Sequence, residues 1–271
     1  MDIKQTKNEK NVATVEVTVT KQEVDEQKDH AVTELASQVT VKGFRQGKAP
    51  KNLAEQHLNP EKVTDHVINH LLSSAVTKTL SEYKYHLFGR PVLNDLDAKG
   101  ENWKIVLNFP LYPTFELGDY KNTIKSSIKT ATKKKKESDK TQNKEDRLDH
   151  IYTTLLKNTP IDIPSSVIDE EVNYSLQRLA AQAQSLHLTL DKYLSAINRT
   201  PDQVKEEYKQ KAADSLKLDL ILIEIAKKEK IEATQEEITS LAKSANLSDN
   251  QDNRLRSIIV RRKVLDLLAS F

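Results

Sequence analysis

Cysteine is absent from this chain of 271 residues, and so are long apolar runs. Without cysteine no disulfide framework and no thiolate metal site can form, a composition that suits a reducing compartment. No apolar run approaches the roughly 18 residues that a membrane-spanning helix needs. Residues 1–6 contain no apolar segment of the kind found in a secretory signal. We therefore expect a cytoplasmic protein that does not contact a membrane.

Glycine is scarce, and its five copies all lie before residue 119. Glycine weakens a helix by about 1 kcal/mol relative to alanine, so its absence from a long periodic stretch favours helix. Apolar residues recur with helical spacing through this second part of the chain. The sequence therefore predicts an all-α C-terminal half.

The first part of the chain mixes two kinds of secondary structure. Residues 12–20 alternate between valine and polar side chains, which predicts a half-buried strand, and residues 103–111 repeat this spacing around Ile105. Thr20 begins a capping box, and Pro60 stands at the first position of a further helix. The predicted fold class is an α+β N-terminal domain followed by an all-α C-terminal domain.

Local signals divide the second half into several helices. One helix is predicted from about Ser165 and a short one over residues 190–198. Thr200 combines with a first-turn proline and a glutamine at capping-box spacing to open a helix that reaches about Lys230. Residues 216–225 also alternate in part like a strand, but the cap and the length favour helix. Because this part is apolar on most sides, we expect it to be buried or to contact another polypeptide.

Positive charge is concentrated in residues 121–145, which hold nine lysines against three acids, a net charge of +6. The chain as a whole carries only +2. This segment has too few apolar side chains for a core of its own, so we expect a solvated linker. A second interpretation is that the four consecutive lysines at residues 133–136 attract the phosphates of a nucleic acid.

A short motif between two predicted helices has the most specific pattern in the chain. It consists of Gly43, Phe44, Arg45, Gln46, Gly47, Lys48, Ala49 and Pro50. Glycine permits backbone conformations closed to other residues, and proline fixes the exit from the turn. Two interpretations remain open. Either Phe44 packs into its own core below a tight turn, or a rigid basic tip with an apolar anchor docks on an acidic or phosphate-rich surface.

This motif resembles the ribosome-docking loop of the trigger factor family, the bacterial chaperones at the peptide exit of the ribosome. The family pattern is Gly-Phe-Arg-x-Gly-Lys-x-Pro, and all six fixed positions are present. Many members carry lysine where Gln46 stands, so this chain lacks one charge that such members offer to the ribosome. Residues 109–113 resemble the end of the family's N-terminal domain, and residues 161–171 resemble the start of an arm in its C-terminal domain.

The resemblance implies three parts: a ribosome-binding domain over residues 1–120, a lysine-rich linker over residues 121–145 and a client-binding domain over residues 146–271. In the family a peptidyl-prolyl isomerase domain normally stands between the first and the last part. Residues 121–145 are too few for a folded domain. The resemblance therefore implies a chaperone that is no enzyme, lacks the isomerase domain and uses no cofactor.

The docking roles follow from the same resemblance. Phe44 would be the apolar anchor, Arg45 would pair with an acidic side chain of a ribosomal protein at the tunnel rim, and Lys48 would touch protein or RNA. The ribosome-binding set is completed by Gly43, Gly47 and Pro50. The expected partners are the large ribosomal subunit, through an exit-tunnel protein and ribosomal RNA, and nascent or unfolded polypeptides, with weak self-association. Binding and release would need no ATP.

Two alternatives remain open. One is a ribosome-independent holdase that resembles periplasmic chaperones with the same type of helical domain. The other is an RNA-binding or ribosome-assembly protein whose main contact is the lysine-rich linker.

A histidine pair is the only metal-like pattern that the sequence suggests. His66 and His70 lie four residues apart on a predicted helix and could share an ion, but the sequence places no third ligand beside them. We therefore expect a solvated or packed pair, with no metal site and no catalytic residue.

Overall fold

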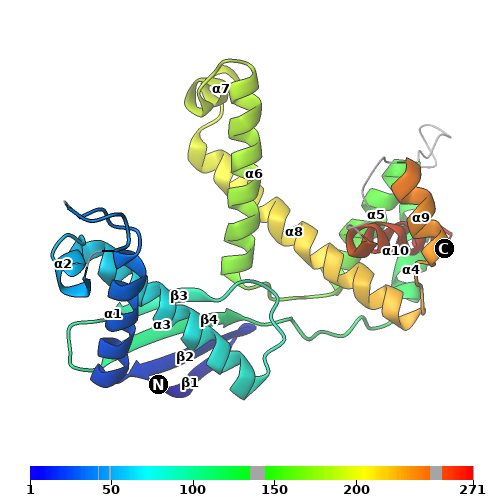
Figure 1. Ribbon diagram of the computed structural model, residues 1–271. Helices are drawn as coiled ribbons and strands as arrows, with labels where there is room; N and C mark the ends of the chain where they lie inside the picture. The colour runs from blue at the N-terminus through cyan, green and yellow to red at the C-terminus, as the bar shows by residue number, and fades with distance from the viewer. Residues whose placement is uncertain (42, 49, 135–143, 245–251, 271) are drawn as a thin grey trace. The chain divides into compact units, whose positions relative to one another are not determined.

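The protein consists of two compact units, Met1–Tyr112 and Pro113–Phe271 (Figure 1). The computed structural model describes the chain except residues 42, 49, 135–143, 245–251 and 271. The division falls inside residues 109–113, where the N-terminal domain is predicted to end, and eight residues before the expected boundary at residue 120. Tyr120 already belongs to the second unit, because its hydroxyl donates a hydrogen bond to Glu229 there.

A four-stranded antiparallel sheet is the foundation of the first unit. Its strands are β1 (Asp2–Glu9), β2 (Val12–Val19), β3 (Val92–Asp97) and β4 (Trp103–Pro110), in the spatial order β1-β2-β4-β3. Lys10 and Asn11 have φ of 50° and 60°, the positive values that a tight hairpin between β1 and β2 requires. Strands β2 and β4 confirm the predicted strands, whereas β3 escaped prediction because nearly all of it is exposed and its apolar residues do not alternate.

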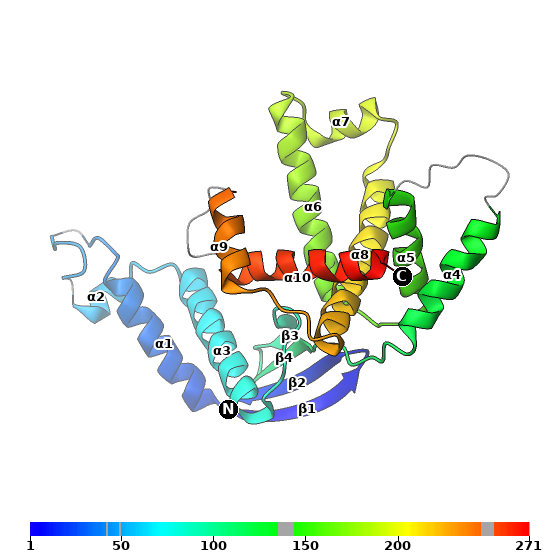
Figure 2. The ribbon, with the colours of Figure 1, turned by 90° about the vertical axis from the view of Figure 1, so that its right-hand side faces the viewer.

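Two helices cover one face of this sheet, as Figure 2 shows. They are α1 (Lys21–Ala36) and α3 (Pro60–Tyr83), and the short helix α2 (Lys51–Glu55) lies between them in the chain. The core is made of alternate side chains from β2 and β4 together with one stripe of each long helix: Ala13, Val15, Val17, Val19, Ile105, Leu107, Phe109, Ala31, Val32, Val63, Val67, Leu71 and Ala75. This architecture confirms the predicted α+β class.

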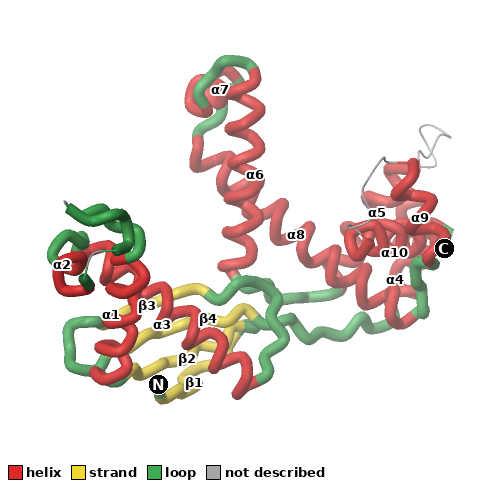
Figure 3. Tube along the Cα trace, in the orientation of Figure 1, coloured by secondary structure: helices red, strands yellow, loops and turns green. Residues whose placement is uncertain are grey.

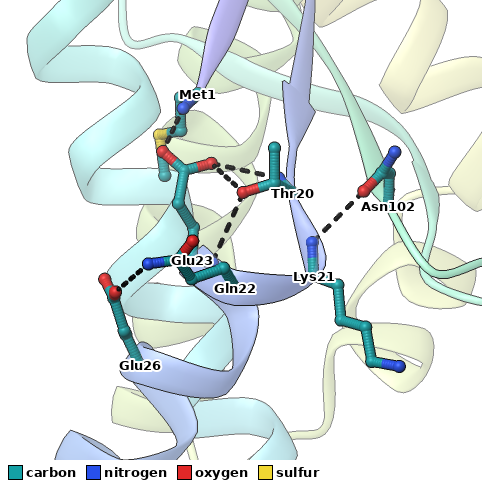
Figure 4. A network of polar contacts seen from close by, with 7 residues as sticks. All are labelled: Met1, Thr20, Lys21, Gln22, Glu23, Glu26 and Asn102. Carbon is teal, nitrogen blue, oxygen red and sulfur yellow. Dashed lines mark hydrogen bonds and ion pairs between the residues drawn. The ribbon is translucent and has the colours of Figure 1, made fainter.

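The start of α1 is held by a polar network, drawn in Figure 4. The Thr20 hydroxyl accepts a hydrogen bond from the Glu23 backbone N–H, and a Glu23 carboxylate oxygen accepts the Thr20 backbone N–H at 3.0 Å. The Met1 amino group binds the other Glu23 oxygen. Burial raises the pKa of Glu23, but the hydrogen bonds from Met1 and Thr20 outweigh it and lower the pKa overall. The predicted capping box is therefore confirmed. The contact between Met1 and Glu23 also ties α1 to the start of the first strand.

The regular structure in the described residues of the second unit is all helical (Figure 3). Its helices are α4 (Tyr120–Lys134), α5 (Lys144–Asn158), α6 (Ser165–Ser185), α7 (Leu190–Ala196), α8 (Pro201–Lys228), α9 (Gln235–Ser244) and α10 (Asp252–Ala269). Helices α6, α7 and the first half of α8 form an arm, and the second half of α8 packs against α5 and α10 (Figure 1). The capping box at Thr200 is present, and residues 216–225 are helical as predicted. In the described part of the chain, no helix is both long enough and apolar enough to cross a bilayer.

The expected linker over residues 121–145 needs correction. Its first part is helix α4, whose Ile124 is fully buried. The Ser127 hydroxyl lies 2.7 Å from His150 Nε2 and 2.8 Å from the Thr154 hydroxyl, both on α5. Tyr120, Ile124 and Ile128 recur every four residues, so a few apolar side chains suffice to dock one face of the helix. The rest of the expected linker, residues 135–143, lies outside the described residues.

Candidate functional site

The loop that follows α1 is fixed by its own backbone. The Gly47 N–H donates a hydrogen bond to the Val39 carbonyl at 3.3 Å, and the Gln46 side-chain amide donates to the Gln38 carbonyl at 2.9 Å. Gly47 has φ of +73°, and a Cβ atom there would lie 2.6 Å from the Ser37 carbonyl oxygen. Only glycine fits this position, since any side chain would collide with the end of α1.

Two tight turns shape the tip of this loop. The Phe44 N–H donates to the Val41 carbonyl at 3.0 Å, and the Lys48 N–H donates to the Arg45 carbonyl at 2.9 Å. Gly43 lies in the first turn with φ of +92°. Pro50 ends the loop, and its carbonyl accepts the first backbone hydrogen bonds of α2. The two glycines and the proline thus define the path that the motif predicts.

The side chains of the tip point into solvent. Phe44 is 42% exposed although it is a large aromatic residue, and Arg45 and Lys48 on either side of Gln46 are exposed as well. The interpretation in which Phe44 packs into its own core is therefore wrong. Gln46 is engaged with Gln38 in the same loop, so its amide serves the loop's shape. The tip presents one apolar side chain followed by two cations.

Three titratable side chains meet at the base of this loop, between α1 and α3. His66 Nε2 lies 3.2 Å from Glu34 Oε2, and His70 Nε2 lies 3.7 Å from the same oxygen. The two imidazole rings are stacked with centroids 4.6 Å apart. The sequence places the two histidines on one face of a helix. It does not place the Glu34 carboxylate beside them, because Glu34 belongs to α1, which only the tertiary fold brings alongside α3.

The second unit carries a cavity of about 550 Å³ between the C-terminal part of α8 and α10. Its floor is apolar and its rim is charged. The lining residues are Leu222, Ile223, Ala226, Lys227, Lys230, Ile231, Glu232, Arg256, Ser257, Val260 and Arg261. Ile223 is exposed within it, so the apolar stretch at residues 216–225 is partly buried and partly available to another molecule.

The arm carries further exposed apolar groups. Tyr174 on α6, Leu186 directly after α6 and Ile197 directly after α7 are exposed. A second hollow of about 590 Å³ lies between α6 and α8, and its lining includes Arg178, Leu179 and Tyr208. Apolar surface in the second unit is therefore spread over several places and rimmed by charge.

The start of α4 is tied to the end of α8 by a polar cluster. The Tyr120 hydroxyl donates to Glu229 at 2.7 Å, and Lys121 Nζ donates to the same carboxylate at 2.8 Å. Lys228 Nζ lies 5.5 Å from the Tyr120 ring centroid. The hydrogen bonds from Lys121 and then from Tyr120 lower the pKa of Glu229, while burial and this carboxylate raise the pKa of Tyr120. This cluster is structural, and it explains why α4 belongs to the second unit.

Comparison with protein families decides where this chain belongs. The model described as bacterial trigger factor protein matches residues 1–145, and the model described as bacterial trigger factor protein C-terminus matches residues 117–270. The chain belongs to the trigger factor family. The two matches overlap at residues 117–145, so in this family member the N-terminal and C-terminal models follow one another directly.

Individual relatives agree with this assignment. The trigger factor of Caldicellulosiruptor saccharolyticus is 30% identical over 158 residues, which are 54% of this chain and 35% of that protein. The trigger factor of Carboxydothermus hydrogenoformans is 34% identical over 130 residues, 44% of this chain and 30% of that protein. The chain thus spans about a third of the length of the curated relatives it matches.

One solved structure shares the whole fold. It is reported under the words "Promiscuous Substrate Recognition in Folding and Assembly Activities of the Trigger Factor Chaperone". The likeness has a TM-score of 0.69 and covers 100% of this chain and 99% of that one, at 15% sequence identity. At this identity the likeness shows that the trigger factor fold is common to both.

Proposed function

We propose that this protein is an ATP-independent chaperone of the cytoplasm that docks on the large ribosomal subunit at the exit tunnel and binds nascent or unfolded polypeptides. The observation that carries the proposal is the exposed Phe44 on a glycine-locked loop, followed by the exposed Arg45 and Lys48. Membership of the trigger factor family supports the same function.

The loop suits a docking contact of moderate strength. Burying the exposed part of Phe44 against a partner would contribute about 1 kcal/mol, because 42% of this large apolar residue is still in water. Arg45 would pair with an acidic side chain of the ribosomal protein, and Lys48 would contact protein or RNA phosphate. The backbone of the loop is already ordered by its internal hydrogen bonds, so little conformational entropy is lost on binding.

The second unit suits weak binding of many different polypeptides. Its apolar floor between α8 and α10 and the exposed groups of the arm offer burial that does not depend on a client's exact sequence. The cations at the rim, such as Lys230 and Arg256, keep the surface soluble and exclude no acidic or neutral client. No step of this task needs a nucleotide or a cofactor.

The proposal includes no enzymatic activity. The family matches to the N-terminal and C-terminal regions overlap, which leaves no stretch between them of the size of a folded domain. We therefore propose a chaperone that works without peptidyl-prolyl isomerisation.

Replacing Phe44, Arg45 and Lys48 by alanine tests the docking. We expect cosedimentation with 70S ribosomes to fall at least about tenfold, since an apolar anchor and two charges are removed together. A matched control replaces Val92, Lys28 and Lys78, which are one equally exposed apolar residue and two exposed lysines of the same unit, and should keep full binding. Undiminished binding of the loop variant would overturn the proposal.

The salt dependence of the same assay separates the RNA-binding alternative, which the charge of +6 on residues 121–145 favours. Removing one lysine–phosphate interaction lowers the slope of log affinity against log salt by about 0.7–0.9. If the loop is the main contact, replacing the four lysines at residues 133–136 by glutamine lowers this slope and weakens binding only modestly. Phe44→Ala then weakens binding at every salt concentration. If the replacement of these four lysines abolishes binding while Phe44→Ala does not, the RNA-binding function is correct.

A further inference from the structure

The histidine pair of α3 and the carboxylate of α1 form a cluster that the docking function does not use. Within the described residues, Glu34, His66 and His70 form the one group of three histidine or acidic side chains that could hold a metal ion. Their ligand atoms all lie within 4.8 Å of one another. We propose that these three residues bind a divalent transition-metal ion of the zinc class and that the ion clips the end of α1 to α3.

The spacing of the three ligand atoms is close to that of a tetrahedral site. Zinc bonds of about 2.0–2.2 Å place the ligands of one ion about 3.3–3.5 Å apart. The observed separations of the Glu34 oxygen from His66 Nε2 and from His70 Nε2 are 3.2 Å and 3.7 Å. Small side-chain rotations would therefore bring all three atoms onto one ion.

The backbone favours the same arrangement. Residues four apart on a helix lie on one face, so His66 and His70 present their rings side by side. Glu34 stands in the last turn of α1, opposite this face. His66 Nδ1 is buried and, among the described residues, has no hydrogen-bond partner, so the polar interactions of this ring depend on Nε2, the atom that faces Glu34.

The donor set selects the class of ion. Two imidazole nitrogens and one carboxylate oxygen suit zinc, nickel, cobalt and copper, whereas magnesium and calcium prefer sites made of oxygen alone. All three side chains are at least partly exposed, so an ion can enter from solvent and the remaining coordination position can take water.

The position of the site gives the ion a mechanical effect. Glu34 is three residues before Ser37, whose carbonyl oxygen lies directly under Gly47 of the loop. An ion held by Glu34 and by α3 would join α1, the helix from which the loop extends, to α3. Because the ion binds the folded unit and not the unfolded chain, it would raise the thermal midpoint of the first unit.

Calorimetric titration of the full, untagged chain with zinc chloride tests the proposal. We expect one zinc ion per chain, no measurable binding of magnesium chloride, and a higher thermal midpoint with zinc. His70→Gln and Glu34→Gln should each weaken zinc affinity at least about tenfold, because each removes one ligand. Both residues are exposed, so the variants should keep the circular dichroism spectrum of the wild type. His30→Gln, an exposed histidine of α1 outside the cluster, is the control and should bind as the wild type does.

Cobalt chloride gives an independent reading of the coordination. A visible absorption band in the wild type that disappears in His66→Gln and His70→Gln but is kept in His30→Gln would support the site. Absence of zinc binding, or zinc affinity unchanged in His70→Gln, would overturn it. Full zinc affinity in Glu34→Gln would also overturn the three-ligand site, because the ion would then be held by the histidines alone.

Discussion

Individual residues of the loop show how a local backbone requirement shapes an exposed tip. Gly43 and Gly47 both have positive φ, but only Gly47 also touches another part of the chain, the Ser37 carbonyl. Phe44 is exposed, and its backbone N–H is held in a turn by the Val41 carbonyl. The path of the backbone around Phe44 is thus set by glycines in left-handed conformations.

Gly47→Ala is expected to destabilise the first unit more than Gly43→Ala does. A left-handed backbone alone costs alanine about 1–2 kcal/mol. At Gly47 the Cβ atom would also lie 2.6 Å from a backbone oxygen, which raises the cost to about 3 kcal/mol, whereas nothing lies within 4 Å of Gly43. Urea denaturation of both variants measures the difference, and equal losses of stability would contradict the close approach.

Glu229→Gln is expected to lower the thermal midpoint of the second unit at neutral pH. The pKa of Glu229 is lower in the folded state than its ordinary value, so its contribution is present above that ordinary value and is lost as the pH falls through the folded-state pKa. Thermal denaturation should therefore separate the variant from the wild type at pH 7 and bring the two together as the pH falls through the folded-state pKa. Glu236→Gln, on the exposed start of α9, is the control. A midpoint difference that persists unchanged in acid would show that another interaction is responsible.

At the scale of elements, helix α4 is an example in which a prediction from local composition fails. Residues 121–145 are rich in lysine and poor in apolar side chains, a composition typical of a linker. Yet Tyr120, Ile124 and Ile128 share one face, and that face is covered by other helices of the second unit. A narrow apolar stripe is enough to pack a helix into the fold when neighbouring helices cover that stripe.

Ile124→Ala is expected to destabilise the second unit by about 2–4 kcal/mol, because Ile124 is fully buried and its truncation leaves a cavity. Lys129→Ala, on the exposed side of the same helix, should change stability by less than about 0.5 kcal/mol. Chemical denaturation followed by circular dichroism measures both. A neutral effect of Ile124→Ala would restore the linker interpretation of this segment.

At the scale of the whole molecule, the two units offer two different kinds of surface. The first unit presents one small, rigid tip with defined charges, which suits a single partner. The second presents several shallow apolar regions rimmed by charge, which suit many partners. This division into two kinds of surface fits the proposed function.

The full chain is expected to suppress the aggregation of an unfolded client without accelerating proline-limited refolding. An uncatalysed prolyl exchange takes roughly tens to hundreds of seconds, and this phase should keep its rate when the protein is added. Ile223→Glu, which places a charge in the cavity between α8 and α10, should weaken the suppression. Leu53→Glu, an exposed apolar position of the first unit, is the control and should not. A faster refolding phase would show isomerase activity and contradict the proposal.

The sequence by itself determined the features that depend on neighbours along the chain. The alternation of β2 and β4 could be read in advance because burial of one sheet face sets a period of two along each strand. The capping boxes at Thr20 and Thr200 and the glycine-rich loop could be read because each is stabilised by contacts within a short stretch of the chain. Only the tertiary structure decided that Phe44 is exposed, that α4 is a packed helix and that Glu34 meets His66 and His70. These outcomes depend on which faces of distant segments come together, and burial across such contacts is a property of the folded chain that local spacing does not contain.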